Sequence, residues 1–167
     1  MNKVLIIGSN SFAGSDFADY LLSKKFKVYG VSRNKEINKE HLRYKNNINL
    51  KNFKFFKIDL NLKKDLNKLI KLIKKQKINY IVNFAAQGMV AESWINPQDW
   101  YLTNVVSNSI LIKELSKLKI KKYLNFSTPE VYGHTSSLMK ESNIFAPTTP
   151  YAISRSAQDL NLLAHYK

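Results

Sequence analysis

Short runs of residues typical of β-strands alternate with segments of helical periodicity along almost the whole of this 167-residue sequence. Strands are predicted over residues 3–9, 27–33, 53–60, 80–87 and 121–133, and helices over 14–25, 61–77, 100–119 and from Tyr151 onward. Strands that alternate with helices form right-handed βαβ units, which build a parallel sheet with helices on both faces. The pattern therefore predicts one doubly wound α/β domain over residues 1–167, long enough to bury a sizeable core.

Charge is the unusual total, because 27 Lys and Arg residues against 12 acids give a net charge of +15. Such an excess can mark a nucleic-acid-binding surface. Residues 61–77 favour a simpler interpretation, since Leu62, Leu66, Leu69 and Ile73 recur at helical spacing and lysines cover the other faces. No aromatic residue lies among these lysines to stack on bases. We expect a solvated basic exterior and no nucleic-acid partner, although this exterior attracts anionic ligands such as nucleotides.

The composition also excludes other classes of protein. There is no cysteine, which excludes disulfides and thiolate chemistry. No apolar run is long enough to span a bilayer, and the N-terminus lacks the features of a signal peptide, so we expect a cytoplasmic protein. His41, His134 and His165 lie far apart without metal-ligand spacing, and no G-x-S-x-G elbow is present. We therefore expect neither a metal site nor serine-hydrolase chemistry.

In "LIIGSNSFAGSDF" the first predicted strand runs directly into a loop and then a helix. A dinucleotide-binding fold needs small residues there, for a tight turn and for close approach of the backbone to a pyrophosphate at the helix N-terminus. Gly8 and Gly14 meet this need, and Ser11 stands midway, where its hydroxyl could bind a phosphate. The alternative is a plain strand–helix turn, with Ser15 as a possible helix cap. We favour a dinucleotide-binding (Rossmann) domain.

The ends of the second and third predicted strands bear on the choice of dinucleotide. A carboxylate at the end of the second strand would bind the ribose hydroxyls of NAD, but Ser32 and Arg33 stand there instead. They favour the 2′-phosphate of NADP, unless Arg33 is merely another surface cation. Asp59 and Leu60 close the third strand, where an adenine would lie, and Asp59 could equally cap the following helix.

The ordered set "GSNSFAG", "IDL", "NFAAQ", "TNVVSN", "STPEVYG" and "PYAISR" resembles the extended short-chain dehydrogenase/reductases that act on nucleotide sugars, above all the sugar-nucleotide 4,6-dehydratases of dTDP-glucose and GDP-mannose. The resemblance covers nearly the whole chain and implies NAD or NADP as cofactor. The residues it assigns to the cofactor are Gly8, Ser11, Phe12, Gly14, Ser32, Arg33, Asp59, Leu60, Ala85, Ala86, Gln87, Asn104, Ser127, Tyr151 and Arg155. Proteins of the family run to roughly twice this length, so we expect the N-terminal Rossmann part without the C-terminal substrate lobe, and no turnover by this part alone.

The resemblance also implies a catalytic tyrosine–cation pair. Tyr151 would remove a proton from the sugar 4-hydroxyl while hydride passes from C4 to the nicotinamide. A phenol has an ordinary pKa of about 10, and a cation one helical turn away favours the phenolate. Family members usually carry lysine at that position, and here it is Arg155. Arginine keeps the charge but is larger and planar. The alternative is an ordinary aromatic and cation on an amphipathic helix.

Two further catalytic residues follow from "STPEVYG". Thr128 matches the hydroxyl that hydrogen-bonds the reacting sugar oxygen. Glu130 matches the base that removes the C5 proton once C4 is a ketone, after which water leaves from C6 and hydride returns there. Pro129 occupies the place of an aspartate that protonates the leaving hydroxyl in dTDP-glucose dehydratases and that the GDP-mannose type lacks. Glu130 could instead be a solvated loop acid.

Two other functions stay open on this sequence. A nucleotide-sugar 4-epimerase shares the first oxidation but needs no C5 base, and a non-catalytic NAD(P)-binding sensor needs none of the chemistry. The resemblance also implies a homodimer, in which the helices beginning near residues 99 and 151 pair across the axis.

Overall fold

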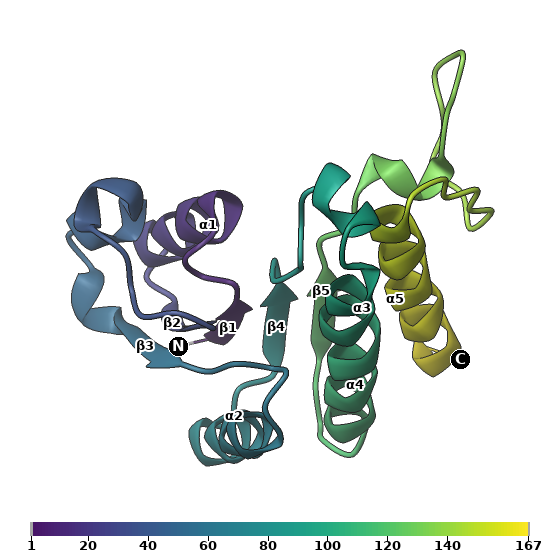
Figure 1. Cartoon of the computed structure of the whole chain (residues 1–167). Coiled ribbons are helices and arrows are strands. Elements are labelled where there is room, and N and C mark those ends of the chain that lie inside the picture. The colour runs from purple at the N-terminus through teal and green to yellow at the C-terminus, as the bar shows by residue number, and fades with distance from the viewer. Residues whose placement is uncertain (1, 167) are drawn as a thin grey trace. The chain divides into compact units, whose positions relative to one another are not determined.

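The structure, a computed structural model, describes residues 2–166. Its strands and main helices, drawn in Figure 1, are β1 (Lys3–Ile7), α1 (Phe12–Ser23), β2 (Lys27–Ser32), β3 (Phe53–Lys57), α2 (Lys63–Gln76), β4 (Tyr80–Asn83), α3 (Pro97–Trp100), α4 (Asn108–Ser116), β5 (Lys122–Asn125) and α5 (Pro150–Tyr166). All strand pairs are parallel, in the order β3-β2-β1-β4-β5. The predicted parallel α/β sheet is confirmed.

The chain divides into two compact units. The first comprises Met1–Ala85 and Glu114–Phe126, and the second comprises Ala86–Lys113 and Ser127–Lys167. The whole sheet, with α1 and α2, lies in the first unit. The second unit contains α3, α5 and the larger part of α4.

Side chains alternate between the two faces of the sheet, so each face has its own layer of core. On one face Val4, Ile6 and Val28 pack with Ala18 and Leu22 of α1. Figure 1 shows α1 and α2 on opposite sides of the strands. The sheet is therefore covered on both faces, as a doubly wound fold requires.

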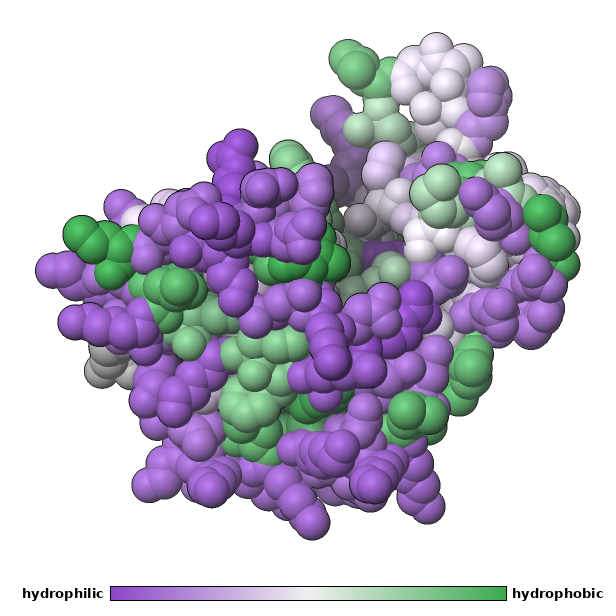
Figure 2. Space-filling model, turned by 60° about the vertical axis from the view of Figure 1, so that its left-hand side comes forward, coloured by the Kyte–Doolittle hydropathy of each residue, from purple (hydrophilic) through white to green (hydrophobic). Residues whose placement is uncertain are grey.

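On the opposite face, α2 turns four apolar residues to the sheet. Leu66, Leu69, Ile70 and Ile73 are buried, and the hydroxyl of Tyr29 in β2 donates to Oε1 of Gln76 at 2.8 Å. Leu62 was also predicted on this face, and that was wrong. The helix begins only at Lys63, so Leu62 precedes it and is 54% exposed. The lysines of α2 occupy the remaining faces, and hydrophilic side chains cover most of the surface seen in Figure 2.

Strands β4 and β5 end earlier than the sequence predicts. At Asn83 the side-chain Oδ1 accepts a hydrogen bond from the amide of Ala85 at 3.0 Å, and this local bond takes the chain out of the sheet. Strand β5 ends at Asn125 and the chain then enters a short 3-10 turn over Pro129–Tyr132. Residues 84–87 and 126–128 therefore lie in loops, which is where ligand-binding residues of a parallel sheet are expected.

Candidate nucleotide and catalytic sites

The glycine-rich loop depends on the absence of side chains. Gly8 has φ +85°, and a Cβ there would lie 2.7 Å from the backbone nitrogen of Ala85. At Gly14 a Cβ would lie 2.2 Å from the carbonyl oxygen of Gly8. Both glycines are therefore fixed by close backbone packing between β1, α1 and the loop after β4.

Ser11 caps the helix that follows this loop. Its Oγ accepts from the amide of Gly14 at 3.0 Å and donates to the carbonyl of Gly8 at 2.8 Å. Ser11 and not Ser15 is the cap, because α1 begins at Phe12 and Ser15 is buried inside the helix. The hydroxyl proton expected to meet a phosphate is bonded to Gly8.

The start of α1 nevertheless fits a phosphate. The first amides of a helix have no carbonyl partner within it, and the helix dipole favours an anion there. The Oγ of Ser11 already accepts from the amide of Gly14. The amides of Phe12 and Ala13 are therefore the first-turn donors best placed to donate to a pyrophosphate oxygen. The loop suits a dinucleotide through backbone amides.

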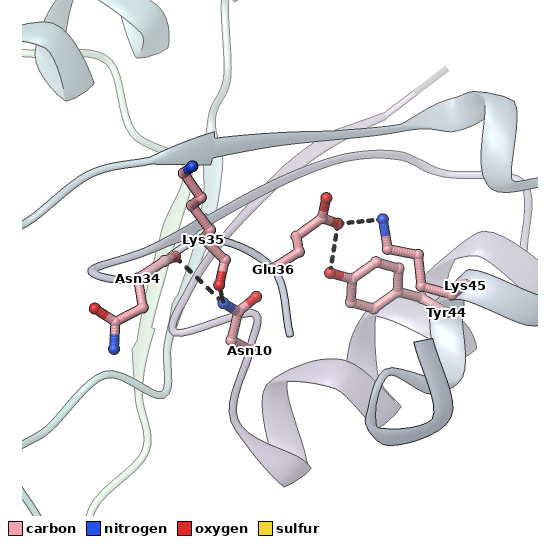
Figure 3. Close-up of polar contacts among 6 residues, drawn as sticks. All are labelled: Asn10, Asn34, Lys35, Glu36, Tyr44 and Lys45. Carbon is pink, nitrogen blue, oxygen red and sulfur yellow. Dashed lines mark hydrogen bonds and ion pairs between the residues drawn. The ribbon is translucent and has the colours of Figure 1, made fainter. Parts of the chain in front are cut away.

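Asn10 joins the glycine-rich loop to the segment after β2. Its amide donates to Oγ of Ser32 at 3.0 Å, and its Nδ2 donates to the carbonyl of Lys35 at 2.8 Å and to that of Asn34 at 3.4 Å. Figure 3 shows both of these hydrogen bonds leaving the side-chain nitrogen of Asn10. Arg33 lies between Ser32 and Asn34 in the sequence and is exposed.

Asp59 does not cap α2, as one interpretation of the sequence had suggested. Its Oδ1 accepts from the amide of Asn61, two residues on, at 3.0 Å, and the helix begins at Lys63 without a side-chain cap. Asp65 closes this turn instead, since its Oδ2 accepts from the amide of Asp59 at 3.1 Å. Asp59 and Leu60 are both partly buried, at the end of β3 where the sequence predicts an adenine contact.

Asn104 organises the second unit. It lies fully buried in a π-helical segment, Tyr101–Ser107, that joins α3 to α4. Its Oδ1 accepts from the amide of Gln87 at 2.8 Å, and its Nδ2 donates to the carbonyl of Gln87 at 3.0 Å and to Oγ of Ser154 at 2.9 Å. Ser154 donates in turn to the carbonyl of Tyr151 at 2.7 Å. One side chain thus ties the loop after β4 to the helix that carries Tyr151.

The start of α5 is capped from two places. Thr149 Oγ1 accepts from the amide of Ala152 at 3.1 Å, and Oγ of buried Ser93 accepts from the amide of Tyr151 at 3.2 Å. Sequence reasoning missed Ser93 because it lies 58 residues from the amide it serves. A lone serine in a short 3-10 helix, Ala91–Trp94, carries no sequence signal of such a role.

The four residues predicted to be catalytic all belong to the second unit. Thr128 precedes the Pro129–Tyr132 turn, and its Oγ1 accepts from the amide of Glu130 at 3.4 Å. Glu130 and Tyr151 are partly buried, whereas Arg155 is only 3% exposed. Neighbouring Ser127 hydrogen-bonds Asp159 of α5, a residue that the sequence did not single out.

The predicted cofactor residues are divided between the units. Gly8, Ser11, Phe12, Gly14, Ser32, Arg33, Asp59, Leu60 and Ala85 belong to the first unit, and Ala86, Gln87, Asn104, Ser127, Tyr151 and Arg155 belong to the second. In the part of the chain that the structure describes, no cluster of three or more His, Asp or Glu side chains could hold a metal ion, and no helix could span a membrane.

Proteins of known structure share the fold of this chain. The UDP-Glc/GlcNAc 4-epimerase of Campylobacter jejuni superposes with a TM-score of 0.86 at 26% identity, over 99% of this chain and 49% of that one. The dTDP-glucose 4,6-dehydratase of Bacillus anthracis, solved in complex with NAD, gives a TM-score of 0.81 at 26% identity, over 99% of this chain and 51% of that one.

Several curated relatives are named as dehydratases. The dTDP-D-glucose 4,6-dehydratase of Dictyostelium discoideum is 32% identical over 100% of this chain and 41% of its own length. The GDP-mannose 4,6-dehydratase of Vibrio cholerae is 30% identical over 93% of this chain and 43% of its own length. The chain thus spans less than half the length of these two relatives. Residues 5–167 match the family described as GDP-mannose 4,6 dehydratase. The chain therefore belongs to the GDP-mannose 4,6-dehydratase family.

Proposed function

We propose that this chain is the dinucleotide-binding part of a nucleotide-sugar 4,6-dehydratase and that it works in the cytoplasm. The observation that carries the proposal is the family match over residues 5–167, a range that contains the close-packed Gly8 and Gly14 loop and the residues Thr128, Glu130, Tyr151 and Arg155. The bound nicotinamide would accept hydride from the sugar and later return it. The protein's own residues would bind the cofactor and move the protons.

In this mechanism Tyr151 takes the proton of the sugar 4-hydroxyl, and Thr128 donates a hydrogen bond to the same oxygen as charge develops on it. Arg155 lies one helical turn further along α5 and supplies the cation of the predicted tyrosine–cation pair. Oxidation at C4 acidifies the C5 proton, which the Glu130 carboxylate then removes, and hydroxide leaves C6 as water. Pro129 has no proton to give, so another acid must protonate the leaving hydroxyl.

The test uses a fusion of this chain with the C-terminal half of the Vibrio cholerae relative, because most of the sugar-nucleotide pocket is expected there. The fusion, supplied with cofactor and GDP-mannose or dTDP-glucose, should form a 4-keto-6-deoxy sugar. Glu130→Gln should abolish elimination, and Tyr151→Phe should abolish the first oxidation while cofactor binding persists. A fusion that binds cofactor and substrate but forms no keto sugar would refute dehydration.

A 4-epimerase is the second candidate, favoured by the TM-score of 0.86 to the Campylobacter jejuni epimerase. Epimerisation returns hydride to C4 on the other face of the sugar and needs no C5 base. An epimerised product, with little response to Glu130→Gln, would identify this activity. A non-catalytic sensor, the third candidate, would bind cofactor equally well before and after Tyr151→Phe and would form no product in either case.

For the cofactor we propose NAD or NADP, with NADP preferred. The end of β2 offers Ser32 and Arg33 and no carboxylate, which suits a 2′-phosphate. The solved Bacillus anthracis relative holds NAD, so the preference needs a direct measurement. Titration calorimetry with NADP and NAD should show Arg33→Ala weakening NADP by about tenfold and NAD hardly at all.

We also propose that the chain forms a homodimer through the helical residues 97–112 and α5. In a protein with 27 cations, residues 97–112 contain no Lys or Arg, and Leu102, Val106 and Ile110 recur every fourth residue with exposures of 44%, 48% and 47%. On α5, Ile153 and Leu160 are 42% and 51% exposed. Exposed apolar stripes without lysine are typical of surfaces that a second helix pair covers.

A further inference from the structure

Glu36 is the first acid along the chain after β2, four residues beyond Ser32. Its position in the sequence would allow it to supply the ribose-binding carboxylate that Ser32 and Arg33 do not. In the structure, however, the Glu36 carboxylate binds two other side chains. Its Oε1 accepts from the hydroxyl of Tyr44 at 2.9 Å and pairs with Nζ of Lys45 at 2.7 Å. Figure 3 shows the Glu36 side chain directed toward these two partners and away from Asn10.

Tyr44, one of the two partners of Glu36, is packed in the core. Tyr44 is fully buried in the α1-side core, and its ring stacks on that of Phe53 in β3 with centroids 4.1 Å apart. Burial, reinforced by the hydrogen bond and charge of Glu36, raises the pKa of Tyr44 far above its ordinary value. Tyr44 therefore remains a neutral hydroxyl that donates to Glu36 at any physiological pH.

The other charged side chains between the end of β2 and Glu36 are positive. Asn10 fixes the carbonyls of Asn34 and Lys35 to the glycine-rich loop, so the backbone of residues 32–35 is tied to the loop that would hold the pyrophosphate. Arg33 and Lys35 are both exposed there. With Glu36 neutralised by Lys45, the charges left beside the end of β2 are cationic.

We propose that Tyr44 and Lys45 hold Glu36 out of the adenosine-ribose site and thereby set the selectivity between NADP and NAD. A carboxylate accepts hydrogen bonds from the 2′- and 3′-hydroxyls of NAD and repels the 2′-phosphate of NADP. Releasing Glu36 therefore weakens NADP and strengthens NAD. The inference rests on the proposed function, since it requires that this loop binds a dinucleotide.

The test measures dissociation constants for NADP and NAD by titration calorimetry on the full 167-residue chain. Tyr44→Phe keeps the ring stack on Phe53 and removes the hydroxyl, and Lys45→Met removes the opposing charge. In each variant the ratio of the NADP to the NAD dissociation constant should rise by about tenfold over wild type. Adding Glu36→Gln to either variant should return the ratio to the wild-type value.

Glu40→Gln is the matched control, because Glu40 is an exposed acid of the same segment and its loss should leave the ratio unchanged. Circular dichroism checks that each variant folds, and Lys45→Met, at the surface, carries the test if Tyr44→Phe does not. An unchanged ratio in a folded variant overturns the role of Glu36 while leaving the proposed function intact. Failure of the wild type to bind either dinucleotide overturns the proposed function itself.

Discussion

Gly8 and Asn104 each serve two segments that are distant in sequence. Gly8 makes the turn after β1 and lets the backbone at Ala85 approach closely. Asn104 satisfies both backbone groups of Gln87 and the hydroxyl of Ser154. A substitution at either position therefore disturbs two segments at once, and its cost should exceed that of an ordinary loop or helix change.

Gly8→Ala should destabilise the protein by about 2–3 kcal/mol, because the new methyl group meets backbone atoms and the φ of +85° is strained for alanine. Urea denaturation of both proteins measures the difference. Gly88→Ala is the control, since no atom lies within 4 Å of a Cβ there. Equal losses for the two variants would contradict the packing described for Gly8.

Asn104→Ala should cost about 2–4 kcal/mol, because it removes three hydrogen bonds and leaves buried partners unsatisfied. Thermal and urea unfolding report this loss. Leu138→Ala, at a fully exposed position of the same unit, should change stability by less than about 0.5 kcal/mol. A fully stable Asn104→Ala variant would show that the three bonds contribute nothing.

At the starts of three helices of this fold, side chains accept hydrogen bonds from backbone amides. Helix α1 begins at the Ser11 cap, α5 begins under Thr149 and Ser93, and α2 is preceded by the turn that Asp65 closes. In each case a hydroxyl or carboxylate accepts from a backbone amide that has no carbonyl partner.

Asp65, in the first turn of α2, should make the stability of the fold depend on pH. The hydrogen bond from Lys68 and that from the amide of Asp59 lower the pKa of Asp65 below its ordinary value of 3.8. Because the folded pKa is the lower one, the carboxylate stabilises the fold fully above the unfolded pKa, and this contribution is lost as pH falls through the folded pKa. Asp65→Asn should therefore lower the urea midpoint at pH 7, and the difference from wild type should shrink below about pH 4. Asp99→Asn, at an exposed acid, serves as control.

Much of this could be predicted from local patterns. The 3.6-residue period of α2 correctly marked Leu66, Leu69 and Ile73, and short runs of β-branched, aromatic and other apolar residues marked all five strands. The strand ends were missed because a side-chain bond at Asn83 ends β4 inside an apolar run. The π-helical segment and the role of Ser93 were missed because both depend on partners far along the chain. The predicted catalytic and cofactor roles remain predictions for the experiments above.

At the scale of the whole molecule, charge is distributed unevenly. Lysines cover the exposed faces of α2. Residues 97–112, in contrast, contain no lysine and expose Leu102, Val106 and Ile110. A helical stretch that lacks lysine and exposes apolar side chains presents a surface suited to burial.

Val106→Glu should therefore weaken self-association by at least about tenfold, because an unpaired carboxylate would be buried in the dimer. Sedimentation velocity over a range of concentrations measures this. Ile48→Glu changes an isoleucine that is 95% exposed in the first unit, and it should leave association unchanged. A wild-type chain that stays monomeric at every concentration would rule out the dimer.

Gly30 lies in the middle of β2, where a Cβ would come within 2.5 Å of the Phe53 ring. That ring supports Tyr44, and Tyr44 restrains Glu36. A single methyl group added in the centre of the sheet would thus be transmitted through two stacked aromatics to the surface segment proposed to discriminate between dinucleotides. On this proposal, a change inside the core that touches no ligand would alter which dinucleotide the protein prefers.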